Sequence, residues 1–271
     1  ALRKYSQLAV QYTGIFDDAF NAAGRADDLV LVYGGFENVY HFNEDEDGVE
    51  NGNELGALYY PVDGRPAYTY FDAWGTTSYI AGGLGFEHQL VAMNWSVDEL
   101  IAYIQTGQQP ATDTVVLPTI EGTNIKEGTL AATLHGLEEM QDFAAHYGMH
   151  HVVYEGGPHL VALQYGWNPD TGDYALTDEE FERLDSLFSR AIEDDRLEGI
   201  MTTLLDGARA AGVKTHVMFD SAEMPGLSQW SKFGFLSHIF QDFSTAPKYR
   251  ATQAWMAANP RWWSSLQRED L

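Results

Sequence analysis

Cysteine is absent from the 271-residue chain. Its absence excludes disulfide bonds, thiolate metal sites and cysteine nucleophiles, although it does not fix the cellular compartment. Long apolar runs are missing too, since no hydrophobic stretch reaches the length of a membrane-spanning helix. The first residues, ALRKYSQLAV, contain no recognisable signal peptide, so we expect any targeting segment to have been removed or to lie outside this sequence.

Positive charge is scarce. The chain has 15 Lys and Arg against 40 Asp and Glu, which gives a formal net charge of −25 at pH 7. The cations are scattered along the chain, so a nucleic acid duplex or an anionic membrane would be repelled, and we expect neither as a partner. The acidity itself indicates solubility rather than any particular fold.

Hydrophobic residues make up 45% of the chain and aromatic residues 13%, which is enough for a packed core. Apolar periodicity and capping signals predict helices at 3–22, 97–106, 129–147, 177–211 in two segments, and 230–258. Short β-rich runs predict strands near 28–34, 67–72, 150–155 and 214–220. Strands that alternate with helices predict a parallel sheet, in a single α/β domain over 1–271 with a loop insertion at 41–66.

The stretch HVVYEGGPH brings a carboxylate to the tip of the third predicted strand. Alternation along the strand predicts that His151, Val153 and Glu155 share one face. Ligands of α/β folds bind at the carboxyl ends of strands, and Gly156 and Gly157 would leave room for one there. The alternative is that Glu155 only caps a helix or pairs with an arginine.

Aromatic and polar side chains collect after three of the predicted strands. Flat apolar rings beside hydrogen-bonding groups suit sugars, which present C–H faces and a rim of hydroxyls, although each ring taken singly could also belong to the core. The candidate substrate-binding residues are Tyr70, Asp72, Trp74, His159, Trp167, Ser221 and Trp230.

Several segments resemble the carboxyl-terminal half of a (β/α)8 glycoside hydrolase of the large retaining clan. They are VVYEGGPHL, FDSAEMPGLSQWSKFGFLSHIFQD and APKYRATQAW, while LRKYSQLAVQYTGIFDDAF resembles the helix after the fourth strand of that clan. The resemblance implies a TIM barrel in which this chain supplies about strands five to eight, with Glu155 as the nucleophile. It implies hydrolysis of β-glycosidic bonds in a plant or algal polysaccharide and a secreted or extracellular protein. An open doubly wound α/β sheet is the alternative fold.

Retaining hydrolysis also needs an acid/base carboxylate, which the resemblance places after strand four and therefore upstream of Ala1. The pairs Asn43-Glu44 and Asn53-Glu54 have the expected composition but lie in a long polar loop. We therefore expect the N-terminal half of the same barrel as a partner. The alternative is a non-catalytic carbohydrate-binding protein on a degenerate barrel.

The acidic stretch NEDEDGVENGNE has the spacing of a calcium-binding loop. Alternating oxygen ligands converge on Ca²⁺, a central glycine permits the sharp turn, and a glutamate at the twelfth position can bind through both oxygens. A solvated acidic loop is the alternative. We expect structural Ca²⁺ with ligands from Asn43, Asp45, Asp47, Val49, Asn51 and Glu54.

Overall fold

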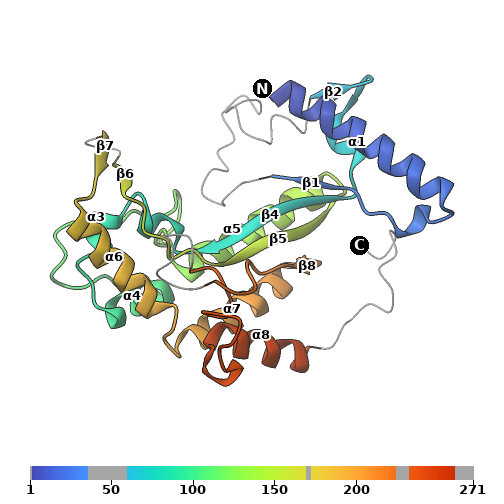
Figure 1. Ribbon diagram of the computed structural model, residues 1–271. Coiled ribbons are helices and arrows are strands. Elements are labelled where there is room, and N and C mark those ends of the chain that lie inside the picture. The colour runs from blue at the N-terminus through green and yellow to red at the C-terminus, as the bar shows by residue number, and fades with distance from the viewer. Residues whose placement is uncertain (1, 36–59, 169–171, 224–231, 260–271) are drawn as a thin grey trace.

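The computed structural model describes residues 2–35, 60–168, 172–223 and 232–259, and it has a mixed α/β architecture (Figure 1). Four parallel strands form the central sheet: β1 (Val32–Gly34), β4 (Ala73–Ile80), β5 (His150–Pro158) and β8 (Thr215–His216). The strands lie in the order β1-β4-β5-β8, so spatial order follows chain order. The predicted α/β class and the parallel sheet are therefore confirmed.

Seven α-helices are described: α1 (Leu2–Ala22), α3 (Gln89–Ala92), α4 (Val97–Thr106), α5 (Leu130–His146), α6 (Asp178–Ala191), α7 (Leu197–Ala211) and α8 (Pro247–Ala258). Short 3-10 helices lie at η1 (Ala26–Asp28), η3 (Ala67–Tyr70), η4 (Gly82–Gly85) and η5 (Phe243–Thr245). Two small hairpins join β2 (Pro61–Val62) to β3 (Arg65–Pro66), and β6 (Tyr165–Asn168) to β7 (Gly172–Ala175).

Local capping explains why several helices begin and end where the sequence predicts. The hydroxyl of Ser96 accepts the backbone N–H of Glu99 and the Glu99 carboxylate accepts that of Ser96, which closes the capping box of α4. Thr177 and Glu180 do the same for α6. Gly212 adopts a left-handed conformation with φ of 95° and ends α7.

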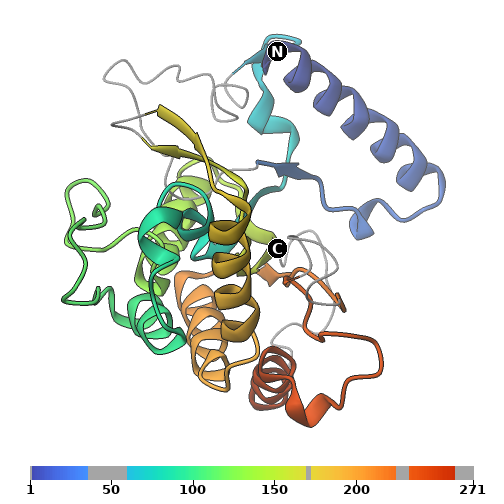
Figure 2. The same cartoon turned by 60° about the vertical axis from the view of Figure 1, so that its left-hand side comes forward.

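The main core lies between the sheet and the helices α4 to α7. Ile80 of β4 and Val153 of β5 pack there with residues such as Leu137, Phe188 and Leu204, all of them buried. The helices α5 and α7 lie side by side against this face, and α8 packs on α7 (Figures 1 and 2). The sheet is thus held by apolar burial on the helix side.

Several predicted elements differ from the structure. The first strand was expected near 28–34 and runs over 32–34, and the third was expected at 150–155 and continues to Pro158, so Glu155 does not lie at its tip. The second strand was expected at 67–72, but those residues include the 3-10 helix η3, and the strand runs over 73–80. The fourth strand was expected at 214–220 and is assigned only at 215–216, although hydrogen bonds from Val217 N to Val153 O and from Phe219 N to Gly156 O extend the pairing. The last helical region, expected at 230–258, is helical in the described residues over 247–258, after the short η5.

The apolar stripe of α1 does not face the described sheet. Leu8, Tyr12, Ile15 and Phe16 recur at helical spacing, and all four side chains are exposed. In both views α1 lies on the β1 side of the molecule, apart from α5, α7 and α8 (Figures 1 and 2). The structure confirms the predicted helix, but this apolar stripe is exposed among the described residues, and α1 instead contacts β1 through Tyr5, whose ring lies 5.4 Å from that of Tyr33.

The sheet face opposite the helices is partly open. A Cβ on Gly75 would lie 3.0 Å from Val32 and 3.4 Å from Tyr154, so these three residues share a face, whereas Trp74 points the other way toward Phe143 of α5. Val32 is 43% exposed. Beyond β8, Val217 and Phe219 are 47% and 38% exposed. Among the described strands, β1 and β8 each have one neighbour, so both outer edges of this sheet are unpaired there.

Candidate active site at the carboxyl edge of the sheet

Glu155 lies near the carboxyl end of β5 and is half-buried. The register with β4 shifts here: Val153 pairs with Thr76 and Glu155 with Thr77, which leaves Tyr154 as an extra residue. A bulge of this kind reverses the alternation of side chains. The expectation that Val153 and Glu155 share a face was therefore wrong, and the bulge turns Glu155 away from the helix-side core that holds Val153.

The hydroxyl of Tyr79 on the neighbouring strand β4 interacts with the Glu155 carboxylate. Tyr79 is 8% exposed, and its burial, then the interaction with the Glu155 carboxylate, raise the pKa of the phenol well above its ordinary value of 10.0. The phenol therefore stays protonated beside the carboxylate. This contact could have been predicted from the sequence only with the correct bounds of β4, because Tyr79 is the second-last residue of that strand.

Rings surround the Tyr79 side chain. Its centroid lies 5.2 Å from that of His159 and 5.6 Å from that of Phe233, and the rings of His159 and Phe233 are 5.3 Å apart. Phe219, beyond β8, lies 5.3 Å from Phe233 and is partly exposed. Burial lowers the pKa of His159, so this imidazole is neutral at pH 7. His159 thus lies beside Tyr79 and Phe233, and its role in binding substrate stays a prediction.

The two glycines after Glu155 do not leave an empty space. A Cβ on Gly156 would lie 2.0 Å from the hydroxyl oxygen of Ser78, and a Cβ on Gly157 would lie 2.9 Å from the terminal carbon of Met218. Gly157 also has φ of 123°, which disfavours other residues. The expectation that these glycines make room for a ligand is corrected: they let the side chains of neighbouring strands pack against the β5 backbone.

Two hydroxyl–imidazole pairs cross the sheet beneath this edge. The oxygen of Thr76 lies 2.7 Å from Nε2 of His151, and that of Ser78 lies 2.8 Å from Nε2 of His216. Burial lowers the pKa of each of these histidines to about 4, and for His151 the nearby His216 adds to the effect. Both imidazoles are therefore neutral at pH 7, and each is paired with a hydroxyl of β4.

The depressed pKa of His151 predicts acid sensitivity. Between pH 6.5 and about pH 4, His151 is protonated in the unfolded chain but stays neutral in the folded chain. The free energy of unfolding therefore falls as the pH is lowered through this window. At about pH 5 the loss from His151 alone is expected to be roughly 2 kcal/mol. The variant His151→Gln keeps a partner for Thr76 but cannot titrate, and urea unfolding at high and low pH should show a smaller pH dependence. Equal pH dependence in both proteins would contradict the prediction.

Two carboxylates that follow β8 are held by the backbone. Asp220 Oδ1 accepts the N–H of Ala222 at 3.1 Å, and Glu223 Oε2 accepts the N–H of Phe233 at 3.2 Å. Lys248 donates from Nζ to the carbonyls of Lys232 and Phe233 at 2.9 and 3.0 Å. Burial lowers the pKa of Lys248 to about 7, against the opposing influence of the two carboxylates. This corner fixes Phe233 beside Tyr79 and His159.

Three predicted substrate-binding residues lie at the opposite end of β4. Tyr70 donates its hydroxyl to the carbonyl of Val62 at 2.9 Å, and Asp72 accepts the N–H of Leu31 at 2.8 Å. Trp74 is fully buried against Phe143, with ring centroids 5.6 Å apart. Their expected position at the carboxyl edge was wrong, because the strand begins where the sequence had placed its end.

The other predicted positions divide into two groups. Ser221 is exposed after β8, and Trp167 lies in the β6–β7 hairpin that follows β5, so both are on the carboxyl side of the sheet. Trp230 lies outside the described residues. So do all the predicted calcium ligands, Asn43, Asp45, Asp47, Val49, Asn51 and Glu54. Calcium binding by this loop stays a prediction.

The described helices include none that is both long and apolar enough to cross a membrane. No protein-family model matches the chain, and neither a curated protein nor a solved structure shows significant similarity to it.

Proposed function

We propose that the chain is the nucleophile-bearing part of a retaining glycoside hydrolase that cleaves β-glycosidic bonds of a plant or algal polysaccharide. The observation that carries the proposal is the half-buried Glu155 near the carboxyl end of a parallel strand, where its carboxylate interacts with the phenol of Tyr79. In barrel enzymes the catalytic groups come from this end of the strands. A secreted location and structural Ca²⁺ at 43–54 belong to the same proposal.

The sheet supports a barrel as the complete fold. Consecutive strands of a (β/α)8 barrel are neighbours and its helices lie outside, whereas the order of a doubly wound sheet reverses at a switch point. The described sheet keeps chain order throughout, with α5 and α7 on one face. These features favour the barrel over the open sheet, with the described strands as about the fifth to the eighth.

The open face and edges of the sheet would be covered by the other strands of that barrel. Val32, Val217 and Phe219 expose apolar surface, and the outer edges of β1 and β8 are unpaired among the described strands. Both features are costly in water, since unpaired strand edges promote association and apolar surface favours burial. We assign the upstream half of the same barrel as the occupant, because it would bury the face and pair both edges at once.

The chemistry assigned to Glu155 is nucleophilic attack on the anomeric carbon. The carboxylate forms an ester with the sugar as the glycosidic oxygen leaves with a proton from an acid, and water then cleaves the ester with retention. Tyr79 would hold one carboxylate oxygen so that the other points to the sugar. The acid must lie about 5–5.5 Å from Glu155, and we place it on the upstream half of the barrel.

A non-catalytic carbohydrate-binding protein is the second candidate. The observation that favours it is the partly exposed ring of Phe219, which borders the packed rings of Phe233, His159 and Tyr79. Rings can hold the C–H face of a sugar whether or not an acid faces Glu155. The two candidates differ in one measurable property, which is whether Glu155 forms a covalent bond with a sugar.

Covalent labelling tests the proposed function. The complete protein is incubated with a panel of 2-deoxy-2-fluoro-β-glycosyl fluorides, whose fluoride leaves without help from an acid and whose fluorine slows hydrolysis of the ester. We expect the mass of one sugar on the peptide that contains Glu155. Binding of polysaccharide without any adduct would instead support the carbohydrate-binding protein.

A further inference from the structure

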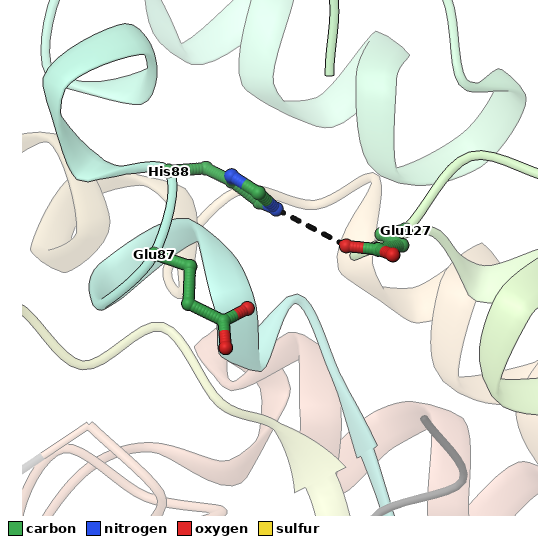
Figure 3. Close-up of side chains that lie close together, drawn as sticks. All are labelled: Glu87, His88 and Glu127. Carbon is green, nitrogen blue, oxygen red and sulfur yellow. Dashed lines mark hydrogen bonds and ion pairs between the residues drawn. The ribbon is translucent and has the colours of Figure 1, made fainter. Parts of the chain in front are cut away.

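Three side chains with metal-ligating atoms meet beside η4, away from the contacts of Glu155. Glu87 and His88 follow the 3-10 helix after β4, and Glu127 lies just before α5. Each offers one ligand atom within 4.8 Å of the other two, and Nε2 of His88 lies 3.3 Å from Oε2 of Glu127. Figure 3 shows the imidazole of His88 pointing across to the Glu127 carboxylate, with the side chain of Glu87, the preceding residue, on the same side of the group.

The charges at this position are unbalanced. Two carboxylates share one imidazole, and the side chains of His88 and Glu127 are only 12% and 29% exposed, so water screens them incompletely. The neighbouring Lys126 directs its ammonium to the carbonyl of Leu117 instead. A divalent cation would neutralise both carboxylates and use the imidazole nitrogen as a third ligand.

Space beside the ligand atoms is kept open by Gly83. A Cβ at this position would lie 3.4 Å from Oε2 of Glu87 and 3.8 Å from Nε2 of His88, so any larger side chain would border the ligand atoms. Backbone hydrogen bonds also hold the two segments that carry these side chains. The backbone of Glu127 accepts a hydrogen bond from Tyr103 of α4 at 2.7 Å, and Gly83 O accepts the N–H of His88 at 2.9 Å.

The geometry points to a binding site for a first-row divalent cation such as Zn²⁺ or Mn²⁺, held by Glu87, His88 and Glu127. One imidazole and two carboxylates suit these ions, whereas Ca²⁺ takes six to eight oxygen ligands. Three protein ligands leave positions for water. The ion would join the end of β4 to the start of α5, across the 39 residues that separate His88 from Glu127.

Thermal melting of the complete protein with and without metal tests this site. The protein is freed of metal on a chelating resin and kept in excess CaCl₂, so that occupancy of the 43–54 loop does not change. Added ZnCl₂ or MnCl₂ is expected to raise the melting temperature, and calorimetric titration to show one tight site. The variant Glu87→Gln should weaken that binding by about tenfold or more.

Glu87→Gln separates a metal site from a simple ion pair. It leaves the contact between His88 and Glu127 intact and removes one of two like charges, so without Zn²⁺ or Mn²⁺ its melting temperature should equal or exceed that of the wild type. The control His135→Gln disrupts a comparable pair, in which Nε2 of His135 lies 3.4 Å from Glu139, and should leave the tight site unchanged. No rise with either ion in the wild type, or an equal rise in Glu87→Gln, overturns the proposal.

Discussion

Glu155→Gln is expected to abolish both the covalent adduct with 2-deoxy-2-fluoro-β-glycosyl fluorides and the turnover of polysaccharide. A neutral amide cannot form the glycosyl ester, so the rate should fall by on the order of 10⁴-fold or more. Binding should persist, because the exposed ring of Phe219 and the buried rings behind it are unchanged. Mass spectrometry of the labelled peptide and binding to insoluble polysaccharide measure the two effects separately.

Tyr79→Phe is the matched variant for this experiment. It keeps the ring among His159 and Phe233 and removes only the hydroxyl that interacts with Glu155. The loss of one hydrogen-bond donor beside a charged group predicts a labelling rate about tenfold lower, with the adduct still on Glu155. Labelling of another carboxylate in the wild type, or an undiminished adduct in Glu155→Gln, would remove Glu155 from the role of nucleophile.

Gly85→Ala is expected to destabilise the fold by about 3 kcal/mol or more. A Cβ at Gly85 would lie 1.8 Å from the carbonyl oxygen of Val161 and 2.9 Å from its carbonyl carbon, so a backbone segment has to move. That segment is held in place, since Leu163 N donates to Gly85 O at 3.1 Å. Urea unfolding followed by circular dichroism measures the change.

Gly199→Ala provides the control for that substitution. Gly199 lies in α7, and a Cβ there meets nothing within 4 Å. Alanine favours the helix over glycine by about 0.5–1 kcal/mol, so this variant should be slightly more stable than the wild type. Equal stability of Gly85→Ala and Gly199→Ala would show that Gly85 does not lie against the backbone of Val161 as the structure has it.

The helices could be predicted closely from the sequence because their signals are local. Ser96 with Glu99 and Thr177 with Glu180 fix where α4 and α6 begin, and Gly212 fixes where α7 ends. The strands were harder. The run AYTYFD has strand-like composition yet contains η3, whereas AWGTTSYI forms the central strand β4 because it is buried along its whole length.

The candidate site could be predicted only in part. The position of Glu155 near the carboxyl end of a strand follows from the sequence, although Gly156 and Gly157 lie inside β5, which ends at Pro158. The bulge at Tyr154 does not, because it depends on pairing with Thr76 and Thr77 of another strand. The position predicted for Tyr70, Asp72 and Trp74 was wrong for the same reason, since the predicted bounds of β4 placed them at its carboxyl end and the structure places them at its start.

The sequence by itself determined the α/β class, the bounds of α1 and of α4 to α7, and the strand that carries Glu155, because periodicity, capping and turn residues act over a few positions. Only the tertiary structure decided that Tyr79 meets Glu155, that Ser78 and Met218 occupy the space beside Gly156 and Gly157, and that Glu127 meets His88. These contacts join residues from different strands and loops. They depend on strand register and packing, which no local pattern encodes.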